Sequence, residues 1–563
     1  MSILFNRRTV GLVLAASFLF RLLFVAHDVH DLALRGPLYD DSFYAFAIAR
    51  NIAAGLGSTF DRLQPTNGYQ PLYVLLLVPI YWVCGGHAAV PIYAALVLSS
   101  FLDVLTGLIL YRLVRRHASG AAALYALVLW GFGPAIVRQA LNGLETALAM
   151  FLLAATLEYY VNVYRRQPDP SRRQTATLGL LLGLAVFARI DAVLFAATLG
   201  GDMLWRGRRA ALRRAAIVFG VVAAVLAPWC ISSQLVVGGV WPESGTATRF
   251  LSEAYASHDV PVLAHAAPTS GAPPQLLVFN LSRSMLLLGT APAAHVFTRV
   301  AEILLQAAHL EQDAALYIIG SLVALLVLGA IFVVHRQRLT RGGSMPADFD
   351  FLYLYACLLV AAYSFVVFGH IFFSRYYYPI FFFSILVSAF AFEIFLGLVG
   401  RAAGRRRQGV ALAVIGLHVL ALPYMSWHRV QGGNYRFVNV VDWIAAHTPP
   451  GARIGVFNSG AIGYFSDRQV INLDGKVNPA ALRALRHGGI RRYIDAQGID
   501  YVIDHQWTLG RFLFGERGGK EGVVRVAEES ELGVRGWEAY RILPAPGREP
   551  VAASPALLSR LHP

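Results

Sequence analysis

Charged residues are scarce in this chain. They account for 14% of its 563 residues, whereas hydrophobic residues account for 56%, and the mean hydropathy is +0.54. Soluble globular domains average about 25% charged residues. The scarcity excludes an ordinary soluble protein and predicts that most of the chain lies in lipid.

Cysteine is rarer still. Cys84, Cys230 and Cys357 lie in separate apolar stretches, far apart in sequence. This spacing predicts neither a disulfide framework nor a metal-binding knuckle. We expect all three to be small hydrophobic core residues.

A cleavage site is also missing after the first apolar run. Arg7-Arg8 precedes that run, as in a secretory or twin-arginine leader, and Arg21 interrupts it. Because such leaders end in a small-x-small cleavage site, we expect the run to be an uncleaved first span.

The formal net charge of +15 does not indicate a nucleic-acid-binding protein. The arginines form short clusters between apolar runs and no contiguous basic face. Such clusters stay on the cytoplasmic side of a membrane protein. We therefore expect Arg7-Arg8 and the following clusters to be cytoplasmic: Arg112–Arg116, Arg165–Arg173, Arg206–Arg214, His335–Arg341 and Arg401–Arg407.

Apolar segments long enough to cross about 30 Å of hydrocarbon predict roughly eleven spans. They are 9–27, 90–114, 118–136, 144–163, 175–188, 190–206, 212–235, 314–335, 350–370, 377–399 and 409–427. Residues 70–84 are too short to cross unaided, and counting them would place Arg112–Arg116 outside. We interpret them as an interfacial or re-entrant helix.

The chain after Trp427 predicts a separate domain, so we expect a membrane domain at 1–427 and an outer α/β domain at 428–563. Strand-like runs begin at Arg453, Val470 and Tyr501. Helix-like pieces at 438–446 and 479–486 alternate with them. This alternation is typical of a small α/β domain.

With this topology, an unusual set of polar residues falls on or near the outer face. Arginines there oppose the positive-inside bias, and ionisable groups at span ends are costly. We therefore predict one site assembled from several loops. Its candidates are Asp40, Asp41, Asn67, Tyr69, Arg138, Asn142, Glu145, Arg189, Asp191, Glu243, Arg249, His370, Arg375 and Tyr376.

The acidic pair Asp40-Asp41 allows two interpretations. Aspartates before a helix at 42–54 would cap its free amides and complement its dipole. Adjacent carboxylates also suit a general base whose pKa is raised by its neighbour, or a divalent-cation ligand pair.

The other candidates have plain alternatives too. Glu145 also fits a helix start, and Arg189 and Asp191 also fit a structural ion pair. Arg375, beside Tyr376, also fits a snorkelling arginine in an aromatic belt. A guanidinium on the outer face is nevertheless a natural partner for a phosphate.

Several motifs together resemble the C-type glycosyltransferase (GT-C) superfamily. The first runs from Leu38-Tyr39-Asp40-Asp41 to Asn67-Gly68-Tyr69-Gln70-Pro71-Leu72, and the second is Asn142-Gly143-Leu144-Glu145-Thr146. Arg375-Tyr376 with Pro379 resembles a late Arg-Tyr motif, and 449–478 resembles the outer C-terminal domain. The similarity is greatest to the arabinofuranosyltransferase-like branch, which is related to protein O-mannosyltransferases. Ala188-Arg189-Ile190-Asp191 departs from the Arg-Pro-Glu or Arg-Pro-Asp of many relatives.

The resemblance implies a GT-C fold with about 11–13 transmembrane helices and sugar transfer from a polyprenyl-phosphate carrier. The acceptor would be a glycan, lipid or protein of the cell envelope, at the outer face of a bacterial inner membrane. Asp40 would be the base of an inverting reaction. Arg375, Tyr376 and Arg138 would bind the donor phosphate.

The remaining roles follow from the same resemblance. Asp41 and Glu145 would orient the sugar or acceptor, or share a divalent cation with Asp40. Asn67, Tyr69, Arg189 and Asp191 would contact substrate. The sugar, a pentofuranose or a hexose, and the metal dependence are left open.

Two other classes of function are weighed. A lipid flippase would use outer arginines as a headgroup entry site, but it has little use for a fixed outer α/β domain and would place ionisable residues at the midplane. A non-catalytic envelope scaffold would not require Asp40-Asp41.

Overall fold

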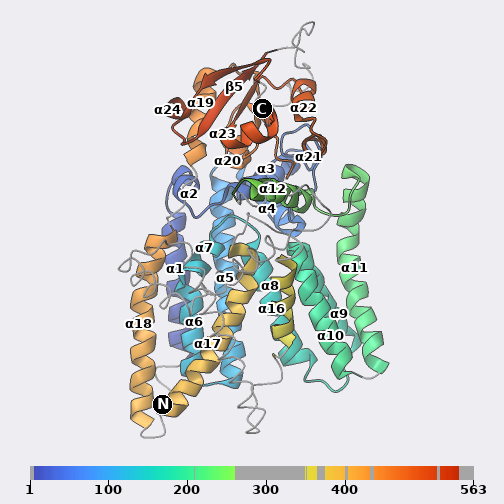
Figure 1. Cartoon of the computed structure of the whole chain (residues 1–563). Coiled ribbons are helices and arrows are strands. Elements are labelled where there is room, and N and C mark those ends of the chain that lie inside the picture. Colours follow the sequence, from blue (N-terminus) through green and yellow to red (C-terminus); the bar gives the residue numbers. More distant parts are fainter. Residues whose placement is uncertain are drawn as a thin grey trace. The chain divides into compact units, whose positions relative to one another are not determined.

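The computed structural model describes residues 6–85, 87–207, 209–259, 349, 351–363, 374–399, 404–430, 436–515 and 520–543 (Figure 1). The chain divides into two compact units. The first comprises Met1–His27, Tyr93–Trp229 and Ser252–Gly432, and the second comprises Asp28–Ile92, Cys230–Leu251 and Gly433–Pro563. The unit that holds the tail thus also includes residues from two earlier stretches, and the expected boundary between residues 427 and 428 stays a prediction.

Among its described residues, the first unit consists of helices and connecting loops and has no strand. Its elements, some of which extend into the second unit, are α1 (Arg7–Val25), α5 (Val90–His117), α6 (Gly120–Phe132), α7 (Pro134–Ala140), α8 (Thr146–Tyr159), η1 (Tyr160–Tyr164), α9 (Arg172–Ala188), η2 (Ile190–Ala192), α10 (Val193–Arg206), α11 (Arg209–Val237), α16 (Phe351–Ala362), η4 (Ser374–Tyr377), α17 (Tyr378–Val399) and α18 (Gly404–Val430).

Six helices among the described residues are long and apolar enough to cross a membrane. They are α1, α5, α8 with η1, α11, α17 and α18. The expected span at 118–136 is broken near Gly133 into α6 and α7, which meet at a bend of 55°. The multi-pass architecture is confirmed.

The other expected spans have different outcomes. Residues 175–188 and 190–206 lie in α9 and α10, which are shorter helices. The segment 350–370 begins as α16 and then leaves the described residues, and 314–335 lies outside them altogether. The fourteen-residue α4 (Pro71–Cys84) is about 21 Å long at 1.5 Å per residue, and its interfacial placement stays a prediction.

A fully buried ion pair ties the helices of the first unit together. The guanidinium of Arg21 (α1) lies 2.5 Å from an Asp103 oxygen (α5), and neither side chain is exposed. The same guanidinium donates to the Gly131 carbonyl at 2.7 Å, and the Tyr378 hydroxyl donates to Asp103 at 2.6 Å. Removing one member would leave an uncompensated buried charge, so the pair fixes α1, α5, α6 and α17.

The second unit is an α/β assembly. Its helices are α2 (Val29–Arg35), α3 (Asp40–Ala53), α4, α12 (Glu243–Asp259), η5 (Arg436–Asn439), α19 (Val440–His447), α20 (Gly460–Phe465), α21 (Pro479–Arg486), α22 (Ile490–Ala496), α23 (Gln506–Thr508), η6 (Leu509–Phe514) and α24 (Glu529–Leu532). Its strands are β1 (Arg453–Val456), β2 (Gln469–Asn472), β3 (Tyr501–His505), β4 (Val523–Ala527) and β5 (Trp537–Ile542).

The five strands form one sheet in the order β2-β1-β3-β5-β4. Strands β1, β2 and β3 are parallel, and β5 pairs antiparallel with both β3 and β4. The three expected strands and the expected α/β character are confirmed. The antiparallel pair β4–β5 is an addition that the sequence analysis did not include.

Alternating residues of the sheet enter two hydrophobic clusters. Tyr501 and Ile503 of β3 pack with Trp443 and Ile444 of α19, whereas Val502 packs in a cluster that includes Leu485. Successive side chains of a strand point to opposite faces. The sheet is therefore covered on both faces. Polar residues of the unit lie where the parallel strands end.

Candidate functional site

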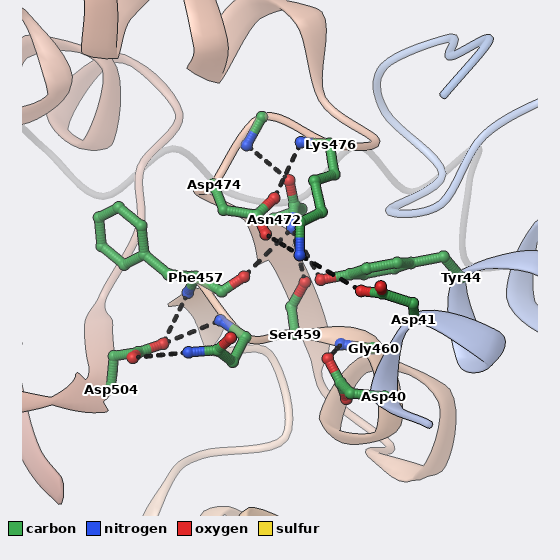
Figure 2. Close-up of polar contacts among 12 residues, drawn as sticks. Asp40, Asp41, Tyr44, Phe457, Ser459, Gly460, Asn472, Asp474, Lys476 and Asp504 are labelled. Carbon is green, nitrogen blue, oxygen red and sulfur yellow. Dashed lines mark hydrogen bonds and ion pairs between the residues drawn. The ribbon is translucent and has the colours of Figure 1, made fainter. Parts of the chain in front are cut away.

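The Asp40 carboxylate binds the start of α20. Its Oδ1 accepts the Ala461 N–H at 2.7 Å. Its Oδ2 accepts the Gly460 N–H at 3.2 Å (Figure 2). A Cβ on Gly460 would overlap the Asp40 carbonyl. Only glycine therefore permits this approach, and the carboxylate is held in one orientation.

The Asp40 carboxylate does not cap α3 itself. Helix α3 begins at Asp40, its N-cap residue Tyr39 makes no side-chain cap bond, and Asp40 and Asp41 lie in its first turn, where negative charge complements the helix dipole. The carboxylate of Asp40 instead satisfies two amides of another helix, which come from a stretch of chain about 420 residues away.

The second carboxylate of the pair contacts a lysine. Asp41 Oδ1 lies 3.2 Å from Lys476 Nζ, which lies 3.4 Å from Asp474 Oδ2. Lys476 and Asp474 follow β2, at the carboxyl end of a parallel strand. Ligands of open α/β sheets bind at such ends. Helix α3 therefore presents Asp40 and Asp41 where a sheet of this kind binds its ligand.

Burial raises the pKa of Asp40 to about 7. The amide of Ala461 opposes this rise, the charge of Asp41 adds to it, and Lys476 opposes it. A carboxyl group with a pKa near 7 is well matched to general-base catalysis at neutral pH. Each oxygen accepts one amide proton and has a further lone pair for a substrate hydroxyl.

Polar side chains at the strand ends hold this region in shape. Asn472 Nδ2 donates to Ser459 Oγ at 2.9 Å and to the Tyr44 hydroxyl at 3.4 Å (Figure 2). The buried Asp504 accepts the N–H groups of Phe457 and Asn458, each at 2.9 Å. The segment that leads into α20 is therefore fixed from both neighbouring strands.

The side chain of Asn67 bonds to Ser233 and to the stretch 239–243 of this unit. Its Nδ2 contacts Ser233 Oγ at 2.7 Å and the carbonyls of Gly239 and Trp241 at 3.0 Å, and its Oδ1 accepts the Glu243 N–H at 3.0 Å. These bonds occupy the polar groups of the amide. The expected substrate contact by Asn67 stays untested, and the observed bonds favour a role in joining two loops.

Tyr69 lies next to the same loop. Its hydroxyl accepts a hydrogen bond from Ser58 Oγ at 2.9 Å, and its N–H donates to the Asn67 carbonyl at 2.8 Å. The side chain is partly exposed.

In the first unit, four residues form the Arg189 cluster: Arg189, Glu145, Asp191 and Tyr363. The Arg189 guanidinium lies 2.7 Å from Glu145 Oε1, 2.9 Å from Asp191 Oδ2 and 3.1 Å from the Tyr363 hydroxyl. Tyr363 also donates to Asp191. Glu145 is the N-cap residue of α8 but makes no side-chain cap bond there, so its carboxylate serves the cluster.

Two aromatic rings join Arg375 to this cluster. Tyr376 stacks on Tyr363 with ring centroids 4.8 Å apart. The guanidinium carbons of Arg189 and Arg375 lie 5.5 and 5.3 Å from the Tyr376 centroid. Arg375 is only 8% exposed, which does not fit a snorkelling arginine with its head in water.

The remaining candidates lie outside these two clusters or outside the described residues. Arg138 lies near the end of α7 and is partly buried. Asn142 accepts the Leu144 N–H and donates to Gln139 and Thr146, each at 2.9 Å. Glu243 and Arg249 belong to α12, and His370 lies outside the described residues.

The predicted candidates therefore fall into two groups. Asp40, Asp41, Asn67 and Tyr69 belong to the second unit, and Arg138, Glu145, Arg189, Asp191, Arg375 and Tyr376 belong to the first. Lys476, Asp474 and Tyr363 were not predicted. A signal for the first was available, because Lys476 is one of only two lysines in the sequence, the other being Lys520.

The described residues do not fit a divalent-cation site. No group of three or more His, Cys, Asp or Glu side chains among them is arranged to hold a metal ion. Asp41 pairs with an ammonium group and Glu145 with a guanidinium, and both are poor surroundings for a further cation. We derive no catalytic step through a metal.

Residues 65–235 match the model of the Alg9-like mannosyltransferase family, and residues 425–550 match a domain of unknown function, DUF8728. The fold is similar to that of the Archaeoglobus fulgidus oligosaccharyltransferase tethered with an acceptor peptide, at a TM-score of 0.56 and 14% identity over 89% of this chain and 70% of that one. The matched family supports glycosyltransferase activity, and the fold is that of GT-C glycosyltransferases.

Two further structures are similar to this glycosyltransferase. AglB from Archaeoglobus fulgidus, in complex with an inhibitory peptide and a dolichol-phosphate, gives a TM-score of 0.54 at 14% identity over 88% of this chain and 69% of that one. ArnT from Cupriavidus metallidurans bound to undecaprenyl phosphate gives 0.49 at 14% identity over 94% and 97%. No curated protein sequence matches the chain significantly. The predicted superfamily and fold class are confirmed.

Proposed function

We propose that this glycosyltransferase moves a sugar from a polyprenyl-phosphate carrier to a cell-envelope acceptor at the outer face of a bacterial inner membrane. The observation that carries the proposal is the Asp40 carboxylate, fixed by two amides and with a pKa of about 7. Such a group accepts a proton from an alcohol during attack, which is the task of the base in an inverting transfer.

In this reaction the acceptor hydroxyl gives its proton to Asp40 while its oxygen forms a bond to C1 of the sugar. The bond between C1 and the phosphate oxygen breaks, and polyprenyl phosphate leaves with the electron pair. Inversion at C1 follows from a single displacement. Asp41 is held by Lys476 and orients a hydroxyl of sugar or acceptor.

Arg375 and Tyr376 are assigned to the donor phosphate. A buried guanidinium presents a planar fork of donors that matches phosphate oxygens, and charge on the departing phosphate grows during the reaction. Arg189 is a weaker candidate because Glu145 and Asp191 already balance its charge. Arg138 is proposed as a second phosphate contact.

A lipid-linked donor is supported by AglB, whose structure contains a dolichol-phosphate. The six apolar helices are also consistent with a donor that stays in the bilayer. Within the superfamily, the motifs favour the arabinofuranosyltransferase-like branch, so pentofuranosyl donors are the first to test.

The experiment is a donor panel with purified full-length protein in detergent or liposomes. Polyprenyl-phosphate pentofuranoses and hexoses are each incubated with envelope extracts, and transfer is followed by mass spectrometry with anomeric assignment by NMR. We expect turnover of one donor class with an inverted product. A retained configuration would remove the single-displacement mechanism, and vesicle-to-vesicle lipid movement without sugar transfer would favour the flippase.

A further inference from the structure

Lys476 occupies a central position among the acidic residues of the second unit. Its ammonium lies 3.2 Å from Asp41 Oδ1 and 3.4 Å from Asp474 Oδ2, and its side chain is 17% exposed. Figure 2 shows the ammonium between carboxylates that come from α3 and from the loop after β2. A compact point charge suits this position better than a planar guanidinium.

The backbone around Lys476 is fixed on several sides. Its N–H donates to Asp474 Oδ1 at 2.8 Å, and the preceding Gly475 N–H donates to Asn472 Oδ1 at 3.0 Å. Gly475 has a φ of +81°, a conformation that favours glycine. A Cβ on Gly68 would overlap the Lys476 carbonyl. The ammonium therefore has a defined place and is not a mobile surface charge.

The other titratable groups packed around the acidic pair do not replace this charge. Tyr44 lies on α3, and burial raises its pKa above the ordinary value, so it stays neutral. Between α4 and α20, Tyr81 and Tyr464 bond to each other at 2.8 Å, and Arg50 of α3 donates to the Tyr464 carbonyl. His30 of α2 contacts Phe465, with ring centroids 4.7 Å apart and the rings tilted by 35°. Among the described residues, Lys476 is thus a cation in direct contact with one member of the pair, Asp41.

We propose that Lys476, supplied by the tail, is a positioning residue of the sugar-transfer reaction, which holds Asp41 beside Asp40 and sets the pH range in which Asp40 accepts a proton. This inference rests on the proposed function. It also makes the tail part of the catalytic machinery, because both the lysine and the amides that orient Asp40 come from residues after 450.

The test measures the protonation of Asp40 directly and then its effect on rate. Full-length protein is exposed to a water-soluble carbodiimide and a small amine between pH 5 and 9, and the modified Asp40 peptide is quantified by mass spectrometry. Carbodiimides react with the protonated carboxyl. The pH profile of kcat/KM is recorded in parallel with the polyprenyl-phosphate sugar that the donor panel identifies.

Two variants are expected to shift the midpoints in opposite directions, and two are expected to keep the wild-type midpoints. Methionine is similar to lysine in length but carries no charge. Lys476→Met should therefore move the midpoints of Asp40 labelling and of kcat/KM about one unit to higher pH, because a nearby opposite charge shifts a carboxyl pKa by ~1–3 units. Lys476→Arg keeps the charge and restores the midpoint. Asp474→Asn keeps the acceptor for the Lys476 N–H but removes a negative charge, and shifts both midpoints to lower pH.

Lys520→Met is the matched control, since Lys520 lies in the tail against Tyr540, and its midpoints should equal those of the wild type. If Lys476→Met does not fold, Asp474→Asn still decides the matter. Unchanged midpoints in both variants would overturn the inference. If the labelling midpoints shift but no donor supports sugar transfer, the proposed function is wrong. The positioning role then fails too, because there is no transfer reaction for Lys476 to serve.

Discussion

The two acidic clusters of this glycosyltransferase are balanced in different ways. In the first unit, one buried guanidinium contacts both Glu145 and Asp191 at 2.7–2.9 Å. In the second unit, Asp40 contacts only backbone amides, and Asp41 shares the Lys476 ammonium with Asp474. Arginine stays charged at any physiological pH and forms several hydrogen bonds at fixed angles, whereas amides compensate a carboxylate only in part.

This difference separates a structural charge from a chemical one. Carboxylates held by a guanidinium keep their charge and position, which suits the orientation of neighbouring helices. Burial makes a carboxyl group easier to protonate, as the pKa of about 7 for Asp40 indicates, and the two amides oppose this only in part. The comparison predicts that substitutions in the Arg189 cluster act mainly on stability and substitutions at Asp40 mainly on rate.

The largest effect is expected for Asp40→Asn. Loss of a positioned base lowers the transfer rate by ~10²–10⁴-fold. The asparagine oxygen still accepts the Ala461 N–H, so the protein should fold and bind donor. Single-turnover transfer and donor binding are measured, with Asp41→Asn as the matched control that should lose less. Wild-type-like transfer by Asp40→Asn would remove Asp40 as the base.

The same residue gives a pH dependence of known sign. The wild-type rate should fall as pH falls through about 7, because Asp40 becomes protonated. Since the folded pKa lies above the ordinary 3.8, its contribution to stability is present below about 4 and is lost as pH rises through about 7. The melting temperature of Asp40→Asn relative to wild type should therefore improve between pH 5 and pH 8.

The next largest effect is expected for Arg189→Met. Removing the guanidinium leaves two buried carboxylates without a partner, and breaking such a pair costs about 3–5 kcal/mol. Thermal unfolding followed by fluorescence in detergent should show a large loss. Arg35→Met is the control, because its pair with Asp31 is exposed and should contribute less than about 1 kcal/mol. Equal melting temperatures for the two variants would contradict the distinction.

Arg375 tests the assignment of the phosphate. A charge-assisted hydrogen bond contributes about 1.5–3 kcal/mol, so Arg375→Ala should lose roughly 10- to 100-fold in kcat/KM. Arg375→Lys keeps the charge but loses the planar fork and should recover only part. Binding of undecaprenyl phosphate in mixed micelles is the second measurement. Wild-type turnover of lipid-linked sugar by Arg375→Ala would show that the phosphate lies elsewhere.

The smallest effect is expected for Asn67→Ala. Its side chain joins the loop before α4 to Ser233 and to residues 239–243. Leaving these buried groups without partners costs about 1–3 kcal/mol. The melting temperature should fall while KM for donor and acceptor stays unchanged in the remaining folded protein. A selective rise in KM would restore the substrate contact that the sequence predicts.

The sequence is sufficient to predict what depends on local pattern. Long apolar runs predict spans, and short apolar runs between helix-like pieces predict β1, β2 and β3, because burial and periodicity are local properties. Helix α21 lies exactly at the expected residues 479–486. Strands β4 and β5 have mixed, partly exposed residues, so no apolar run reveals them.

The partners of each charged residue depend on long-range contacts and could not be predicted in the same way. Glu145 and Asp40 both fit helix starts by sequence, and both stand at helix starts. Their carboxylates nevertheless bind groups far along the chain, Arg189 and the amides of α20. No local rule distinguishes a carboxylate that caps its own helix from one that serves another.

The assembly of the second unit from early and late stretches has a consequence for biosynthesis. Asp41 and Lys476 are separated by 435 residues. At about 5–20 residues per second, the ribosome needs on the order of 20–90 s to make the chain between them. During that interval the acidic pair has neither the lysine nor the amides that fix it. Asp40 and the amides that orient it therefore come together only near the end of translation. Under the proposed function, an unfinished chain has no oriented base to take the proton of an acceptor hydroxyl.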